Sequence, residues 1–292
     1  MPNRSPITID GLIRDVSTVH SLPLFYSRLE ETINHPRSSI SDIAKIISED
    51  QGLTARVLRL SNSPLFGYFS RIETIPQAVT VIGVQQVREL ALSLSVMDVF
   101  KGLPEDLVNM DQFWRHSIAT GIAARVLATH QREANLERFF VAGILHDIGR
   151  LLMFIRLPEV CREMLEDCRT NRRLLHVVER ERLTFDHADV GGSLLRKWKI
   201  PPRIAEPVEF HHRPRFAEQY PREASLMHLA DIVVHAMDIG RSGGAFVPTL
   251  EPQAWTDLGT SAEQLASVVK KVDALFEETI LALFGSKPNA HL

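Results

Sequence analysis

The sequence predicts an all-α fold, and three of its features lead to this expectation. Apolar residues recur at helical spacing over nearly the whole chain of 292 residues, whereas we find no sustained strand-type alternation and no hairpin dipeptide between apolar runs. Hydrophobic residues make up 45% of the chain and charged residues 24%, a balance typical of folded globular proteins. The longest apolar stretch, Phe139 to Ile155, has 17 residues and holds His146, Asp147 and Arg150, so it suits a buried helix better than a membrane span.

The overall charge and the cysteine content restrict the class of protein. Thirty-three Lys and Arg against 36 Asp and Glu leave a net charge of -3, which argues against binding to nucleic acid or to an anionic membrane through bulk charge. The two cysteines, Cys161 and Cys168, are too few for a disulfide-stapled secreted scaffold and are expected to be inert thiols. Because the N-terminus has no apolar run of signal-peptide length, we expect a cytoplasmic protein with no membrane partner.

The first hundred residues carry several helix signals. Residues 41–62 hold two apolar stripes at helical spacing, which predict two helices. Pro76 suits the first position of a short helix that Gly83 ends, because proline fits helix starts and glycine fits helix ends. A longer helix is expected from Val84 to Phe100.

The run Gly102-Leu103-Pro104 marks a boundary between an N-terminal helical module, 1–105, and a second module, 106–292. In the second module, Asp111 is placed to cap a helix that continues to about His130. Phe139 to Ile155 is expected to be one continuous core helix, because it is apolar almost all round. Further helices are predicted over Pro158–Cys168, Arg172–Arg182, Asp186–Trp198, Pro201–His212 and Glu223–Gly240.

The last fifth of the chain contains a predicted loop followed by a predicted helix. Residues 241–260 include two adjacent glycines and two prolines, which is typical of a loop. Ser261 and Gln264 have the spacing of a capping box, and an amphipathic helix is expected over 261–284.

Five of the predicted helices each bring a histidine or an aspartate to an apolar face. Burying one ionised carboxylate without a partner costs several kcal/mol, so a set of such groups is tolerable only if its members satisfy one another. A divalent transition metal held by imidazoles and carboxylates does this, and one or two ions of Fe, Mn, Zn, Ni or Co would suit such ligands. The candidate metal ligands are His116, His146, Asp147, His187, His211, His212 and Asp231.

Other histidines are given ordinary structural roles. A single inward histidine is usually a hydrogen-bonded core residue, and His228 and His235, on the same predicted helix as Asp231, are assigned to that class. His130 and His176 are expected at the surface or in loops.

Several motifs carry a resemblance to known proteins. The run Gly143 to Gly149 (GILHDIG) resembles the signature helix of the HD superfamily of metal-dependent phosphohydrolases, and the candidate ligands follow the order of that superfamily's ligand series. Leu53 to Gly67 (LTARVLRLSNSPLFG) and Ile72 to Gly83 (IETIPQAVTVIG) resemble the HDOD family, the HD-related output domain of bacterial signalling proteins. The resemblance extends over about 19–238 and implies an HD-domain-like helical bundle with an N-terminal helical HDOD module.

Two departures from these families concern phosphate binding. HD enzymes often carry a lysine shortly after the His-Asp motif, whereas this chain has Arg150 directly after Gly149, and arginine can bind phosphate bidentately. After His211 and His212 the chain reads Arg213-Pro214-Arg215, without the Gly-Tyr-Pro loop of the HD-GYP phosphodiesterases that act on cyclic-di-GMP.

Two functions from different classes remain open. The HDOD resemblance favours a signalling protein that acts mainly by binding a protein partner, with a structural or sensory metal. The alternative is a metal-dependent phosphohydrolase acting on a phosphoester or nucleotide, such as a cyclic dinucleotide, in which Asp147 bridges two ions and Arg150 or Arg213 holds the phosphate. Nucleic acid is not an expected partner, because Ile40 to Phe100 holds five basic and six acidic residues and so lacks a basic footprint.

Overall fold

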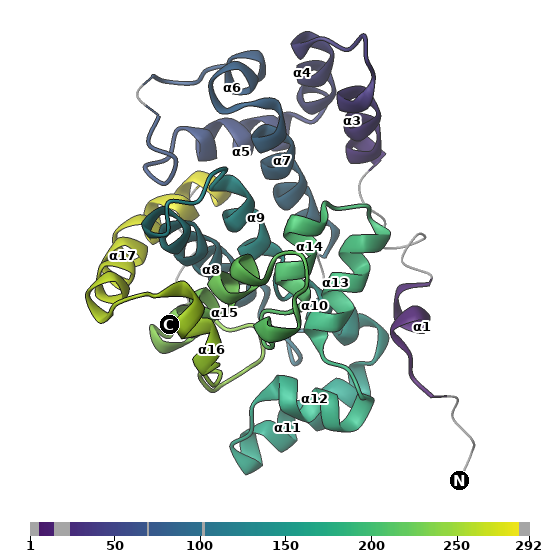
Figure 1. The fold of residues 1–292 in the computed structure, drawn as a ribbon. Coiled ribbons are helices and arrows are strands. Elements are labelled where there is room, and N and C mark those ends of the chain that lie inside the picture. Colours follow the sequence, from purple (N-terminus) through teal and green to yellow (C-terminus); the bar gives the residue numbers. More distant parts are fainter. Residues whose placement is uncertain (1–5, 15–23, 69, 101–102, 286–292) are drawn as a thin grey trace.

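The structure is a computed structural model that describes residues 6–14, 24–68, 70–100 and 103–285 (Figure 1). Every regular element in these ranges is a helix, so the predicted all-α fold is confirmed. None of the helices described combines the length and the apolar content that crossing a membrane requires. Cys161 and Cys168 are buried free thiols, and burial raises the pKa of Cys161 to about 12 and that of Cys168 to about 11.

Five of the N-terminal helices, α3 to α7, form the upper group in Figure 1, whereas the short helix α1 lies apart from them, against α13 and α10. Their starts follow from local capping: the Ser39 hydroxyl accepts from the Asp42 backbone in a capping box, and the Asp50 and Thr74 side chains cap the two helices that follow. Gly83, at a φ of 105°, separates the last two. The helices are α1 (Ile9–Ile13), α3 (Leu24–Asn34), α4 (Ile40–Ser48), α5 (Gln51–Ser61), α6 (Ile75–Ile82) and α7 (Val84–Val99).

In the remainder of the chain, the long helix α8 (Met110–His130) packs against α9 (Glu137–Leu145), α15 (Pro221–Ala236) and α17 (Ala262–Phe284). Helix α10 (Ile148–Arg156) packs on α13 (His187–Lys197). The predicted capping box of Ser261 and Gln264 starts α17. The other elements are α11 (Pro158–Asn171), α12 (Leu175–Leu183), α14 (Pro202–Glu209), the short 3-10 helix η1 (Pro214–Phe216) and α16 (Pro252–Leu258).

The expectation of one continuous helix from Phe139 to Ile155 is wrong. Helix α9 ends at Leu145 and α10 begins at Ile148, so His146 and Asp147 form the junction between two helices. At this junction the His146 ring turns back to the Gly143 carbonyl oxygen, at 2.7 Å, and Asp147 leaves helical geometry with a ψ of 9°. An apolar pattern that runs through both helices cannot reveal such a break, because His146 and Asp147 contact residues that are distant in the sequence.

Three further boundaries differ from the sequence-based expectations. Helix α8 is capped by the Asn109 side chain, which accepts from the Gln112 backbone at 3.0 Å, and Asp111 lies inside the first turn. Helix α14 ends at Glu209, so the two histidines at 211 and 212 follow the helix instead of ending it. The expected loop 241–260 contains α16, which Pro252 begins.

A buried ionic contact joins the N-terminal helices to the rest of the chain. Helix α7 packs on α9, and Glu89 of α7 accepts a hydrogen bond from the Arg203 guanidinium of α14 at 2.7 Å. The Glu89 side chain is 3% exposed, so it depends on this partner and on Arg88, at 3.7 Å, for compensation of its charge. The division into modules at about residue 105 remains a prediction.

We expect Arg203→Ala to lower the free energy of unfolding by about 1–3 kcal/mol at neutral pH, because a buried carboxylate loses its closest charge partner. Burial raises the pKa of Glu89, although the Arg203 guanidinium lowers it. Removing Arg203 should therefore raise this pKa further. A carboxyl whose pKa is higher in the folded than in the unfolded state binds more protons when folded, so stability falls as the pH rises above the unfolded pKa. The destabilisation should therefore be larger at pH 8 than at pH 5.

Urea denaturation at the two pH values measures this difference. The control is Arg162→Ala, which removes an exposed guanidinium paired with Asp106 and Glu159 and should cost less than about 1 kcal/mol. Equal losses for Arg203→Ala at both pH values would contradict the explanation.

Candidate metal centre

Two glycines allow α8 and α9 to touch backbone to backbone. A Cβ atom on Gly143 would lie 2.3 Å from the Cα atom of Gly121, a distance that real side chains do not adopt. Helix α8 carries His116, and α9 leads into His146. The close contact therefore brings the two imidazoles together, with ring centroids 5.3 Å apart.

A second glycine contact holds α10 against the start of α13. A Cβ atom on Gly149 would lie 2.1 Å from the His187 carbonyl oxygen and 2.4 Å from the Gly191 nitrogen. Asp147 precedes α10 and His187 begins α13, so the contact places these two side chains side by side, and the Asp147 Oδ1 atom lies 2.9 Å from the His187 Nε2 atom.

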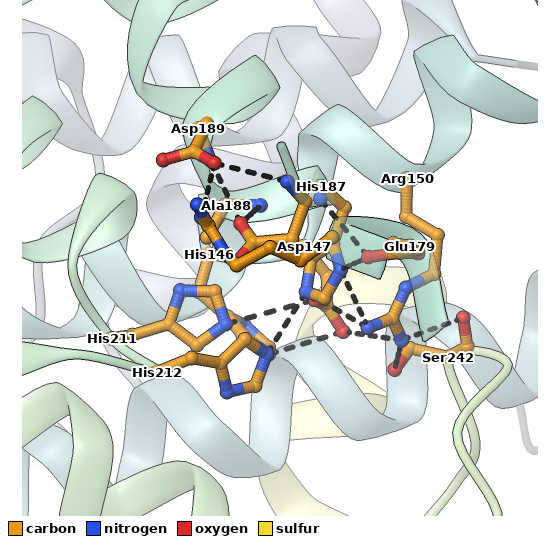
Figure 2. A network of polar contacts seen from close by, with 12 residues as sticks. His146, Asp147, Arg150, Glu179, His187, Ala188, Asp189, His211, His212 and Ser242 are labelled. Atoms are coloured by element: carbon orange, nitrogen blue, oxygen red, sulfur yellow. Dashed lines mark hydrogen bonds and ion pairs between the residues drawn. The ribbon is translucent and has the colours of Figure 1, made fainter. Parts of the chain in front are cut away.

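The seven residues predicted from the sequence come together in one place, and five of them appear in Figure 2. Asp147 lies at the centre: its Oδ2 atom is 3.3 Å from His146 Nε2, and its Oδ1 atom faces His187 and, at 3.9 Å, His211. All except the half-buried His212 are buried. The arrangement forms two donor groups that share the Asp147 carboxylate: the Asp231 group, with His116, His146 and Asp231, and the His187 group, with His187, His211 and His212.

The distances within both groups suit ligands of a common ion. Two atoms bonded to one ion at about 2.1 Å lie about 3.0 Å apart at right angles and about 4.2 Å apart when opposite. In the Asp231 group, Asp231 Oδ1 is 3.2 Å from His116 Nε2 and 3.6 Å from His146 Nε2. In the His187 group, the Nε2 atoms of His187 and His212 are 3.1 Å apart.

In two of the rings the inward nitrogen atom has no hydrogen-bond partner. The Nδ1 atoms of His146 and His211 lie 2.7 and 2.6 Å from the carbonyl oxygens of Gly143 and Val208, and because a carbonyl only accepts, these nitrogens carry the proton. Their Nε2 atoms are buried and have no hydrogen-bond partner. A buried polar atom without a partner is costly, whereas a metal ion would satisfy both nitrogens.

Charged neighbours determine the protonation of the cluster. Burial favours the neutral form of Asp147, but Arg150, His146 and His187 outweigh burial and hold the pKa of this carboxyl well below its usual range. Burial lowers the pKa of His146, but the Asp147 and Asp231 carboxylates outweigh it and raise that pKa to about 10. In contrast, burial and the neighbouring His146 lower the pKa of His211 to about 3, so this imidazole is neutral and has a lone pair to donate.

The two arginines expected to hold phosphate are engaged elsewhere. The Arg150 guanidinium is buried, and it donates to the Ser242 hydroxyl at 2.6 Å, to the Ser242 carbonyl oxygen at 3.0 Å and to Asp147 at 3.2 Å (Figure 2). Arg213 donates to Asp189 at 2.6 Å. Both guanidinium groups thus neutralise carboxylates or anchor backbone within the protein.

Sequence reasoning missed several neighbours of the cluster. Buried Glu179 accepts from the His187 backbone nitrogen at 3.0 Å and lies 2.5 Å from His187 Nδ1, which leaves His187 Nε2 facing Asp147. The expected surface position of His176 is wrong, because its half-buried ring stacks on His212 with centroids 4.0 Å apart. Helical spacing could have indicated Glu179, which lies four residues after buried Leu175 and four before buried Leu183, but no local signal marks Ser242.

Comparison with known proteins gives a family match over most of the chain. The family model described as "HDOD domain" matches residues 19–214. A curated relative, an uncharacterised protein of Treponema pallidum (strain Nichols), is 25% identical over 225 residues, which are 76% of this chain and 43% of the relative. The chain therefore spans less than half the length of that relative.

Solved structures share the fold over nearly the whole chain. An HDOD domain protein with unknown function from Geobacter sulfurreducens is 25% identical with a TM-score of 0.71, and 94% of this chain and 97% of that one are covered. A protein from Shewanella amazonensis SB2B described as "Putative phosphohydrolase" is 24% identical with a TM-score of 0.71, with 93% and 96% covered. A protein from Marinobacter aquaeolei VT8 described as a "Putative signal transduction protein" is 17% identical with a TM-score of 0.69, with 96% and 61% covered.

Gly149→Ala should lower the free energy of unfolding by about 1–3 kcal/mol, because the added methyl group must push α10 away from α13. Denaturant titration of the purified variant measures the loss. The control is Gly52→Ala on the exposed side of α5, where the new Cβ meets only the Asp50 carboxylate, at 3.3 Å, and where losing a helical glycine should leave stability equal or higher. Wild-type stability in Gly149→Ala would show that this contact does not hold the cluster together.

Proposed function

The chain belongs to the HDOD family, and from this premise we propose that it is a regulatory protein of bacterial signal transduction that acts mainly by binding a protein partner. Its buried cluster holds one or two divalent transition-metal ions, Fe, Mn, Zn, Ni or Co, through His116, His146, Asp147, His187, His211, His212 and Asp231. The observation that carries the metal part of the proposal is the convergence of these imidazoles and carboxylates, in which the buried Nε2 atoms of His146 and His211 have no hydrogen-bond partner.

The surroundings of the cluster favour a structural or sensory metal. Most of the donor side chains are inaccessible to solvent, and the nearby Arg150 guanidinium is already engaged by Ser242 and Asp147. A phosphohydrolase needs a cation that is free to hold the phosphate and a coordination position open to substrate. A protein whose metal stabilises the fold needs neither, and it uses its helical surfaces for binding.

One observation supports the alternative of a metal-dependent phosphohydrolase acting on a phosphoester or nucleotide. The two oxygens of Asp147 face different donor groups, Oδ2 towards His146 and Oδ1 towards His187. A carboxylate placed between two groups of ligands suits a pair of ions, the arrangement with which many phosphatases and nucleases stabilise the attacking and leaving oxygens. In this alternative, Asp147 is the central catalytic residue.

We expect the protein, purified without metal-affinity media, to contain at least one transition-metal ion per chain by elemental analysis. Chelation should lower the melting temperature, because the bound ion stabilises only the folded state. Asp147→Ala should lose the metal, since both donor groups share this carboxylate. The control Asp167→Ala removes a partly buried aspartate that pairs with Arg173 and Arg182, and it should keep the metal. A metal-free wild-type protein would refute the metal site.

A second expectation separates the signalling protein from the enzyme. After loading with Mn or Fe under reducing conditions, the protein should hydrolyse generic phosphodiesters and cyclic dinucleotides more slowly than about 1 per second, the lower end of ordinary enzymatic turnover. Faster hydrolysis that disappears in Asp147→Ala would favour the phosphohydrolase.

A further inference from the structure

His235 lies beside the Asp231 group, although sequence reasoning assigned it to the hydrogen-bonded core. It follows Asp231 by four residues on α15, so both side chains lie on one face of the helix. Its Nε2 atom is 3.4 Å from Asp231 Oδ1, and its ring centroid is 4.6 Å from that of His116. The His235 side chain is 12% exposed, so it forms the outer edge of the buried donor group.

His228, on the same face of α15, shows what a structural histidine looks like in this fold. Its Nδ1 atom lies 2.7 Å from the His211 carbonyl oxygen, and its Nε2 atom accepts from the Glu251 backbone nitrogen at 2.9 Å. Both ring nitrogens of His228 therefore serve the backbone, which agrees with the role expected from the sequence. The Nε2 atom of His235 faces a carboxylate oxygen of the cluster instead.

The surroundings of Asp231 Oδ1 have the geometry of a ligand set. Three imidazole Nε2 atoms surround this single oxygen, those of His116 at 3.2 Å, His235 at 3.4 Å and His146 at 3.6 Å. Each separation lies within the span of about 3.0–4.2 Å expected for two ligands of one ion. His116, Asp231 and His235 also each offer one ligand atom within 4.8 Å of the others. Among these neighbours, the buried Nδ1 atom of His116 and Nε2 atom of His146 have no hydrogen-bond partner.

We propose that His235 is an additional metal ligand, which shares an ion with His116 and Asp231 and closes the Asp231 group on its solvent side. This inference rests on the proposed function, from which it takes the metal. Removing His235 should weaken the retention of that ion more than it weakens the fold, because the remaining donors are buried and stay in place. The partly exposed position also means that a small molecule can replace the lost ring.

The test uses Co²⁺ as the probe, with the affinity of the full chain measured by competition against a chelator and the coordination followed by the visible absorption of the bound ion. His235→Ala should bind at least one Co²⁺ about 10- to 100-fold more weakly than the wild type and should change its absorption spectrum. Millimolar imidazole should restore both properties in the variant. His130→Ala, which removes a half-buried histidine at the far end of α8, should behave as wild type.

Three outcomes would overturn the proposal. Unchanged Co²⁺ affinity and spectrum in His235→Ala would show that His235 is not a ligand, while leaving the metal site itself standing. Weaker binding in His235→Ala that imidazole does not restore, together with wild-type binding in the size-matched His235→Gln, would show that the ring acts only in packing. A wild-type chain that binds no Co²⁺, Mn²⁺ or Fe²⁺ would remove both this proposal and the proposed function.

Discussion

Two buried carboxylates, Asp147 and Asp231, impose the constraint on which the centre of this structure depends. Each is about 2% exposed, and each lies within 4.0 Å of at least two imidazole nitrogens. A buried negative charge is tolerated only beside positive charge or a metal, so the neighbouring helices must approach closely enough to supply it. The glycines at 121, 143 and 149 allow this approach, because a Cβ atom at any of the three would occupy the space of the neighbouring backbone.

The same constraint explains how the cluster is connected to the rest of the fold. The break between α9 and α10 turns His146 and Asp147 inward, and the loop after α15 supplies Ser242, whose hydroxyl and carbonyl anchor the Arg150 guanidinium. Helix α14 leads directly to the paired histidines at 211 and 212, and its Arg203 binds Glu89 of α7. The N-terminal helices therefore contact an element that positions metal-ligand candidates, which is a suitable connection for a regulatory protein.

The sequence predicts much of the helical framework because its signals are local. The stripes of α4 and α5, the glycine between α6 and α7 and the capping box of α17 depend only on residues within a few turns of one another. The seven candidate residues were expected to converge because buried carboxylates and imidazoles need polar or charged partners, and because their order resembles that of the HD ligand series. The structure brings them together. The break at His146 and Asp147 could not be predicted, because the apolar pattern continues through it and the contact that Gly149 makes with α13 just after it is between residues distant in the sequence. His228 and His235 look equivalent in the sequence, since both lie on the Asp231 face, and only the tertiary contacts distinguish them.

The central claim is that a metal ion compensates the buried carboxylates. Anomalous diffraction from crystals of the protein, with data collected on both sides of the Fe, Mn, Co, Ni and Zn absorption edges, tests it most directly. We predict an anomalous peak among His116, His146, Asp147 and Asp231, and a second peak between Asp147 and the His187 group if two ions bind. A map without a peak in either place, with the His146 ring donating a hydrogen bond to an Asp147 carboxylate instead, would contradict the claim and would show that protons and Arg150 alone balance the charge.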